Sequence, residues 1–422
     1  MSEKKHKERR RRERAKKEEP KVNKISDVKM AYIMYGKKVF VIPIVIAIIL
    51  GAIIWGIVHN ARKNNAPQET ADNQKEQINY IWGEIKPGTK NENNYTMVTS
   101  ADNVQVPVPT GYTASSASGE NSVKTGFVIY EGTDAVTDSN QWDAQCNRNQ
   151  YVWVPIADVS DMYWRDQTTG KKYGTTYTFK SSSYSKSSSN KKEPQTTSRD
   201  IQSTYLTQYL NGMSREDFLM EMEIDFDKLL NSVATYGGFY IGRYETGDLS
   251  QTTPVVKRIN TDINNQNWYT MWKKARKLSK TSAGVQMIWG TQWDQTMKWL
   301  IDSGAKTYSE VGSDSTNWGN YLNNSFTYYT NTSKNTATKP IGGPSIPSGA
   351  YEGANANNVF DLAGNVYDWT LESNGSGTDY GRNLRGGFYS YNGNEAPVTN
   401  RFGNNPSSIN VIVGFRCSLY IK

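Results

Sequence analysis

Three short stretches near the end of the chain decide the fold: NVFDLAGNVYDWT at 358–370, LRGG at 384–387 and VGFRCSLYI at 413–421. Their glycines permit unusual backbone angles and close approach of neighbouring segments, and the last stretch alternates as a strand does. Residues 388–413, which follow LRGG, are rich in Asn and carry only two charges. The pattern predicts a fixed frame around one polar, weakly charged segment.

Composition separates the first 38 residues from the rest of the chain. Residues 1–38 hold 15 Lys and Arg against 6 Asp and Glu, a net charge of +9, whereas the remainder holds 34 against 35, a net charge of −1. A solvated arm that touches anionic lipid is favoured over a nucleic-acid site, because the glutamates of the arm weaken binding to a polyanion. We therefore expect no nucleic-acid partner.

Residues 39–58, VFVIPIVIAIILGAIIWGIV, form a run of 20 residues without a charge. At about 1.5 Å per residue, a helix of this length spans about 30 Å of hydrocarbon. A signal peptide is the competing interpretation, but its apolar core is only about 7–15 residues long. The sequence predicts one transmembrane helix, and the positive-inside tendency places the basic tail in the cytoplasm and the remainder outside the cell.

The exported part is predicted to hold a polar stalk and one α+β domain. Residues 59–102 are rich in Asn, Gln, Glu and Lys, and such a composition buries too little apolar surface to fold alone. The domain covers 103–422, and its Ser/Lys-rich tract at about 173–200 lacks periodicity and is expected to be a surface insertion. Strands are expected at 103–109, 126–130, 150–156 and 238–245, and amphipathic helices at 218–233, 268–278 and 291–301.

The scarcity of histidine excludes several classes of catalysis. The chain has two histidines, His6 and His59, and both precede the predicted domain. Ser–His–Asp and Cys–His catalysis and histidine-ligated metals are therefore excluded there. Carboxylate pairs are open in principle, but no spacing singles out one pair.

The three stretches resemble the C-terminal half of the formylglycine-generating enzyme, or sulfatase-modifying factor, domain. GFYIGRYE at 238–245 and IWGTQWDQTMKW at 288–299 stand in the order of two further blocks of that family, so the resemblance covers about three quarters of the chain. It implies a C-type-lectin-like fold. It also implies where an active site would lie.

In the catalytic members, two cysteines after the RGG bind copper and oxidise a substrate thiol. Here Phe388 replaces the family's serine, and Tyr391 and Ala396 stand where the two cysteines would be. A copper site of this kind needs its sulfur ligands. We therefore expect no copper and no catalytic residues.

The resemblance implies a structural calcium site in DLAGNVYD at 361–368. Calcium accepts 6–8 oxygen ligands in flexible geometry, so two carboxylates and two loop carbonyls are a suitable start. The alternative is a plain turn with Trp369 packed beneath it, and the family usually has the longer Glu at the last position. Carried over residue by residue, the ligands are Asp361, Gly364, Val366 and Asp368.

Four other residues are expected to stabilise the domain. Arg385 of the RGG and Arg416 of the GFR are predicted to make buried, charge-assisted hydrogen bonds. The lectin-like fold brings its first and last strands together, so Cys146 and Cys417 of an exported domain are candidates for a disulfide. Two buried free thiols are the alternative.

Residues 388–413 have the composition of an antibody paratope, in which rings supply contact area and amides supply adaptable hydrogen bonds. The segment also resembles that of the variable proteins of diversity-generating retroelements, which use this fold and rewrite exposed positions between RGG and GFR by adenine-directed mutagenesis. An ordinary Asn-rich loop of a bacterial lectin-like domain is the alternative. The candidate ligand-binding residues are Phe388, Tyr389, Ser390, Tyr391, Asn392, Asn394, Phe402, Asn404, Asn405 and Asn410.

The sequence thus favours a membrane-anchored, extracellular display protein whose lectin-like domain presents residues 388–413 to an unknown protein or glycan. Two other functions remain open. One is an oxidase of the formylglycine-generating type, and the other is a structural component of a cell-envelope or phage-encoded assembly.

Overall fold

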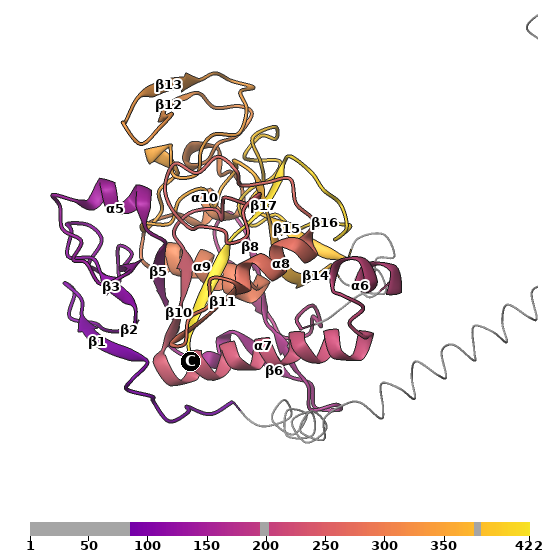
Figure 1. Cartoon of the computed structure of the whole chain (residues 1–422). Helices are drawn as coiled ribbons and strands as arrows, with labels where there is room; N and C mark the ends of the chain where they lie inside the picture. The colour runs from indigo at the N-terminus through magenta and orange to yellow at the C-terminus, as the bar shows by residue number, and fades with distance from the viewer. Residues whose placement is uncertain (1–84, 195–201, 375–380) are drawn as a thin grey trace, which may run out of the picture. The chain divides into compact units, whose positions relative to one another are not determined.

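The computed structural model describes residues 85–194, 202–374 and 381–422, which all belong to one compact unit, Gln77–Lys422 (Figure 1). The predicted basic tail at 1–38 and the predicted transmembrane helix at 39–58 lie outside the described residues. Within the described ranges, no helix has both the length and the apolar character needed to cross a bilayer.

A six-stranded sheet forms the centre of the domain, in the order β11-β18-β10-β5-β4-β3. All neighbouring strands in it are antiparallel. Every residue of β10, β11 and β18 is buried, including the polar residues Gln286 and Ser418, so both faces of these strands are covered. The strands are β3 (Tyr112–Ala114), β4 (Val128–Glu131), β5 (Gln150–Pro155), β10 (Gly238–Gly242), β11 (Ala283–Met287) and β18 (Cys417–Ile421).

Three helices pack against this sheet: α7 (Arg215–Tyr236) on β10 and β18, α8 (Trp268–Arg276) on β11, and α9 (Gly290–Asp302) on β5. Ser214 caps α7, because its side chain accepts a hydrogen bond of 3.0 Å from the Asp217 N–H. The helix ends at Gly237, whose φ of 80° lies in the left-handed region that glycine tolerates.

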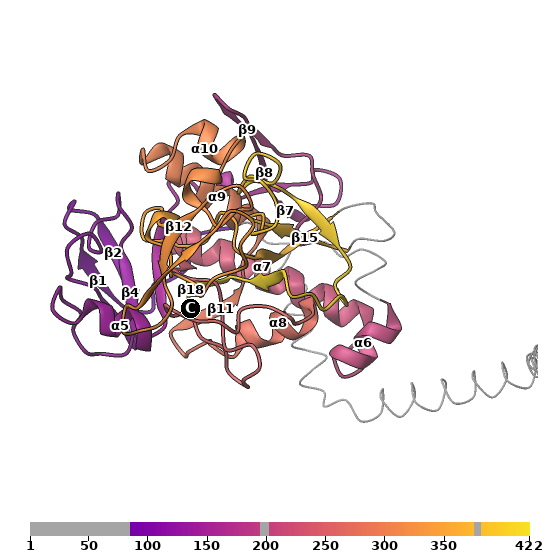
Figure 2. The ribbon, with the colours of Figure 1, turned by 90° about the horizontal axis from the view of Figure 1, so that it is seen from above.

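A second, four-stranded sheet takes one strand from each of the three stretches that decided the fold, and the last stretch then continues into β18 of the first sheet. Its order is β16 (Phe402–Asn404), β15 (Arg382–Arg385), β14 (Tyr367–Ser373) and β17 (Val413–Phe415), with β14 and β17 parallel. Trp369 of β14 is fully buried. Figure 2 shows the N-terminal strands at one side of the domain and β15 and α6 (Ser203–Tyr209) at the other.

The polar stalk ends earlier than predicted. Residues that had been assigned to it form β1 (Tyr95–Thr99), which pairs antiparallel with β2 (Gln105–Pro109). The Tyr95 ring packs edge-on against Tyr236 of α7, with ring centroids 5.2 Å apart. The strand is stabilised by these neighbours rather than by its own sparse apolar content, so composition alone did not indicate it.

The predicted surface insertion at 173–200 is wrong for its first part. Tyr177 and Phe179 of β8 (Thr176–Phe179) are buried and belong to the main core. The many Ser and Lys residues around them are typical of an exposed loop, so the sequence did not indicate that these two aromatic residues are buried. The remaining elements are β6 (Tyr163–Arg165), β7 (Lys172–Gly174), β9 (Tyr184–Ser187), β12 (Phe326–Tyr329), β13 (Thr336–Lys339), α5 (Gln141–Asn147), α10 (Tyr308–Gly312) and three 3₁₀ turns, Val159–Asp161, Thr316–Trp318 and Glu352–Ala354.

The predicted disulfide is absent: Cys146 and Cys417 are both buried free thiols. Cys146 lies in α5, just before β5, and Cys417 begins β18, but β10 lies between β5 and β18. Strands are about 4.8 Å apart, so β5 and β18 are about 10 Å apart, beyond the Cα separation of about 7 Å that a disulfide tolerates. Cys417 instead lies 3.3 Å from the Thr246 hydroxyl, which donates to its sulfur.

Candidate binding surface

Residues 388–413, here called the display segment, gather exposed apolar side chains. Seven large apolar side chains are exposed among the described residues, and four of them belong to this segment. The other three, Met97, Val104 and Ile341, lie outside this segment. The four in the segment are Tyr391 (41% exposed), Phe402 (46%), Ile409 (59%) and Val411 (57%).

Nine of the ten predicted ligand-binding residues have surface that a partner could touch. Ser390, Tyr391, Asn394 and Phe402 are exposed, and the half-buried ones are Tyr389, Asn392, Asn404, Asn405 and Asn410. Phe388 departs from the expectation because it is buried. Its ring packs on Tyr367 of β14 and on Tyr391, with centroids 5.0 and 4.8 Å away. Phe388 therefore supports the exposed ring instead of presenting its own.

Sequence reasoning missed Ile409 and Val411. The predicted binding residues carry amides, hydroxyls or aromatic rings. A single aliphatic residue in a loop gives no sequence signal that its side chain is exposed. It also missed the Tyr367 ring, which lies under Phe402 in a stacked arrangement with an interplanar angle of 16°.

The main chain of the display segment is held by a neighbouring loop at 315–324. The Leu322 N–H donates to the Tyr391 carbonyl at 2.9 Å, and the Ser315 N–H donates to the Gly393 carbonyl at 3.1 Å. The buried Tyr321 hydroxyl lies 3.0 Å from the Gly386 carbonyl and 3.1 Å from the Ala396 carbonyl. These bonds fix the path of the backbone. The side-chain oxygens of Asn404, Asn405 and Asn410 add to this by accepting hydrogen bonds from backbone N–H groups of the same segment.

The glycines of the RGG are required by space as well as by backbone angle. Gly387 has φ 76°, and a Cβ there would lie 2.3 Å from the Ala396 carbonyl oxygen. Gly386 has φ 93°, and a Cβ there would lie 2.9 Å from the Leu362 carbonyl oxygen. Only glycine permits both the positive φ and this close approach.

Beneath the display segment lies an arginine-balanced cluster, defined as Glu193, Asp294, Glu372, Arg385 and Arg401. The Arg385 guanidinium donates to Glu372 at 3.0 Å and to Asp294 at 2.7 Å. The Arg401 guanidinium, from the display segment itself, donates to Glu372 at 2.9 Å and also to Asp294. Burial alone would raise the pKa of Glu372, but the charges of Arg401 and Arg385 lower this pKa to about 2.

Glu193 completes this cluster from the tract that had been predicted to be a surface insertion. Its carboxylate accepts hydrogen bonds from the Gly290 N–H and, at 3.1 Å, from the Thr291 N–H, at the start of α9. Burial and the nearby charge of Glu372 raise the pKa of Glu193 to about 8. Sequence offered no signal for this residue, because its partners are remote in the chain.

A second buried group, the calcium-loop cluster, consists of Glu245, Asp361, Asp368 and Arg416. The Arg416 guanidinium donates to the carbonyls of Gly242 at 2.9 Å and Phe360 at 2.7 Å, and its Nε lies 3.5 Å from Asp368. Arg385 and Arg416 are therefore both fully buried and bonded within the frame.

The two predicted calcium-binding aspartates have oxygens without a hydrogen-bond partner. Asp361 uses one oxygen to accept from the Gly349 N–H at 2.6 Å, while its other oxygen and both oxygens of Asp368 accept no hydrogen bond. Burial raises the pKa of Asp361 to about 6 and that of Asp368 to about 7. Orphaned buried oxygens of this kind fit a cation better than a purely structural turn.

The loop between the aspartates turns as the sequence suggested. Gly364 and Asn365 have φ of 74° and 60°, and the Asn365 side chain donates to Glu245 at 2.6 Å. Nowhere in the described ranges do three or more His, Cys, Asp or Glu side chains converge on one metal position. Calcium here would therefore use two carboxylates together with the carbonyls of Gly364 and Val366.

Two residues stand at the positions of the catalytic family's cysteines, and they differ in exposure. Tyr391 is exposed, whereas Ala396 is completely buried. The thiol of Cys417 is also buried, and burial raises its pKa to about 12, so almost none of it is the reactive thiolate at neutral pH. Neither of the two positions therefore supplies a sulfur ligand.

Comparison with known proteins supports the resemblance drawn from the three stretches. The sequence model of the sulfatase-modifying factor enzyme 1-like domain family matches residues 122–420. Similar solved structures include variable protein 1 of Treponema denticola, at 15% identity and TM-score 0.29, over 43% of this chain and 84% of that one. CarF is similar at 14% identity and TM-score 0.28, over 44% of this chain and 87% of that one. No curated protein matches the chain.

Proposed function

This chain belongs to the sulfatase-modifying factor enzyme 1-like domain family, and on that premise we propose that it is a binding protein rather than an enzyme. Its display segment, 388–413, contacts the partner. The observation that carries the proposal is the concentration of exposed Tyr391, Phe402, Ile409 and Val411 on a backbone that the frame holds in place.

The partner that suits this surface is a protein. Exposed aliphatic side chains such as Ile409 and Val411 gain from burial against another apolar surface, whereas a sugar needs polar groups and an aromatic platform. The surrounding amides can satisfy polar groups at the rim of such a contact. A glycan partner is the alternative, and loss of binding after enzymatic deglycosylation of the partner would reveal it.

The arrangement also suits a segment whose residues change. Backbone hydrogen bonds from 315–324 do not depend on the side chains at 390, 391 or 394, so substitutions there leave the frame unaltered. We therefore extend the proposal to diversification by a retroelement. A reverse-transcriptase gene beside this one, with a near-repeat of the DNA that encodes 388–416, is the expected genomic sign.

The proposal includes anchoring by residues 39–58, with the domain outside the cell, and a structural calcium ion at Asp361, Gly364, Val366 and Asp368. It excludes copper and thiol oxidation. The chemical reason is that Tyr391 and Ala396 replace the cysteines that the catalytic members use. Incubation of the full chain with copper, oxygen and a sulfatase-type cysteine peptide should leave the peptide unchanged; any formylglycine product would refute this part.

The binding proposal can be tested with two matched libraries displayed on cells. One randomises the exposed positions Ser390, Tyr391, Asn394, Phe402 and Ile409, and the other randomises buried positions of the same segment, Phe388, Ala396, Val398 and Val413. We expect the first library to remain protease-resistant and to yield binders to a test protein such as lysozyme, and the second to unfold. Widespread unfolding in the first library would show that the segment is structural and would end the proposal.

A further inference from the structure

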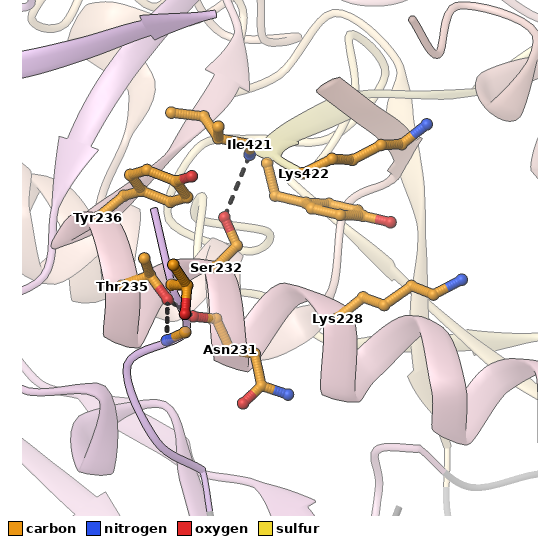
Figure 3. Close-up of a pocket in the computed structure, with 10 residues that line it drawn as sticks. Lys228, Asn231, Ser232, Thr235, Tyr236, Ile421 and Lys422 are labelled. Atoms are coloured by element: carbon orange, nitrogen blue, oxygen red, sulfur yellow. Dashed lines mark hydrogen bonds between the residues drawn. The ribbon is translucent and has the colours of Figure 1, made fainter. Parts of the chain in front are cut away.

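A cavity lies at the far end of β18 from the display segment. Its volume is about 510 Å³, and it is bordered by α7, by the last residues of β18 and by the chain at Gly88 and Thr89 (Figure 3). No acidic side chain lines it. The display segment precedes the first residue of β18, whereas Ile421 and Lys422 at the other end contribute to the cavity wall.

Two ammonium groups share this cavity. Lys228 of α7 and Lys422 extend toward the same side of it in Figure 3. Burial, followed by the charge of Lys228, lowers the pKa of Lys422, which is the sign of two like charges held close together.

Neither lysine has a carboxylate partner within the described ranges. The Lys422 ammonium donates to the Lys280 carbonyl at 2.8 Å, and Lys228 makes no hydrogen bond or ion pair with a described residue. Asp227, which directly precedes Lys228, is paired with Lys172, and Asp225, about one turn before Lys228, is paired with Arg276. Neither of these carboxylates forms an ion pair with Lys228 or Lys422.

The walls supply one free donor and an apolar surface. Ser232 accepts a hydrogen bond of 3.1 Å from the Ile421 N–H, so its hydroxyl proton remains for another acceptor. Thr235 is already occupied, because its oxygen accepts from the Gly88 N–H at 2.7 Å and donates to the Asn231 carbonyl at 2.7 Å. The rings of Tyr236 and Tyr420 line the rest.

We propose that this cavity binds a phosphate ester, with Lys228 and Lys422 facing the phosphate, Ser232 donating to it, and the tyrosine rings against the organic part. A phosphate monoester carries a charge of about −1.5 to −2 at neutral pH, which matches two ammonium groups, whereas a carboxylate carries only one charge. The site is independent of the display segment and of its partner.

The phosphate ester could come from two sources, a soluble phosphorylated polyol or the headgroup of a phospholipid. Both share the chemistry that the cavity recognises, and calorimetric titration of the full chain in a nonionic detergent distinguishes them. One arm uses glycerol 3-phosphate, with glycerol as its uncharged control. The other uses short-chain phosphatidic acid, a phosphate monoester, with short-chain phosphatidylcholine as its control.

Lys228→Gln and Lys422→Gln should each weaken binding about tenfold or more, because each removes a hydrogen bond to a charged group. Lys124→Gln is the matched control, since Lys124 is an exposed lysine outside the cavity and its loss should change nothing. Saturable binding of glycerol 3-phosphate supports the soluble source, and binding of phosphatidic acid alone supports the headgroup. Equal binding of glycerol, binding that survives both lysine substitutions, or no binding in either arm would overturn the site.

Discussion

The two buried acidic clusters contain the same number of carboxylates but differ in how their charge is compensated. Asp294 and Glu372 of the arginine-balanced cluster pair with Arg385 and Arg401, and the Lys192 ammonium, counted here with this cluster, lies 3.6 Å from Glu372. Glu193 accepts backbone hydrogen bonds instead. The three carboxylates of the calcium-loop cluster have one guanidinium, that of Arg416. When all groups are ionised, the first cluster is neutral and the second has a net charge of −2.

The arginine-balanced cluster can therefore be stable without a ligand, whereas the calcium-loop cluster needs bound protons or a cation to compensate its charge. A buried charge is costly unless it is paired, and the first cluster pairs Asp294 and Glu372 with arginines, while burial and the charge of Glu372 raise the pKa of Glu193 to about 8. The second must bind protons or a divalent cation, and burial accordingly raises the pKa of Asp361, Asp368 and Glu245. Experiments on either cluster test this difference in charge compensation.

The largest expected effect comes from Arg385→Met in the arginine-balanced cluster. The substitution leaves Asp294 and Glu372 buried with one guanidinium fewer, so the free energy of unfolding should fall by about 3–5 kcal/mol. Urea denaturation of the domain measures it. Arg165→Met, at an exposed arginine, is the control and should change the value by less than about 0.5 kcal/mol. A loss below about 1 kcal/mol for Arg385→Met would contradict the balanced-cluster interpretation.

Calcium should stabilise the wild-type chain, because it compensates the excess charge of the calcium-loop cluster. At a calcium concentration of about 100 times Kd the gain in unfolding free energy is about 2.7 kcal/mol. Asp368→Asn and Asp361→Asn should each abolish this gain, whereas Asp134→Asn, at an exposed aspartate, should keep it. Identical melting temperatures in calcium and in chelator would remove the site.

The pH dependence should come in part from Glu193. Its folded pKa of about 8 lies above its unfolded value of 4.5, so the folded state holds the proton more tightly between these values. The stabilisation is complete below about pH 4.5 and is lost as the pH rises through about 8. Glu193→Gln should flatten this part of the profile in chelator. A profile with an unchanged slope in that variant would show that another group is responsible.

The smallest effect on stability is expected in the display segment. Ile409→Asn and Tyr391→Asn change exposed side chains, so the free energy of unfolding should move by less than about 0.5 kcal/mol. Phe388→Ala, three residues from Tyr391 but buried, should cost about 3–5 kcal/mol. Thermal melts of the three variants test this ordering, and a costly Ile409→Asn would place that side chain in the frame.

The frame could be predicted because its signals are local. The cap at Ser214, the helical spacing that follows it and the glycine that ends α7 all lie within one stretch of sequence, and so do the glycines of the RGG. Buried strands such as QYVWVP were visible as apolar runs.

The errors came from contacts between residues remote in sequence. Strand order decides whether Cys146 and Cys417 can meet, and no pattern in the chain indicated that β10 separates their strands. Glu193, Asp294 and Arg385 are joined only by the fold, so the arginine-balanced cluster left no local trace. Exposure of Ile409 and Val411 depends likewise on the tertiary structure.

Because β18 follows the display segment in the chain, an error in the reading frame within that segment also removes β18. β18 fills the gap between β10 and β11, and it is encoded immediately downstream of the segment. A frameshift or a premature stop within 388–413 therefore deletes a central strand and leaves two open sheet edges, which are prone to aggregation. Faulty copies would be removed by protein quality control, and only substitutions that preserve the frame would reach a folded, functional molecule.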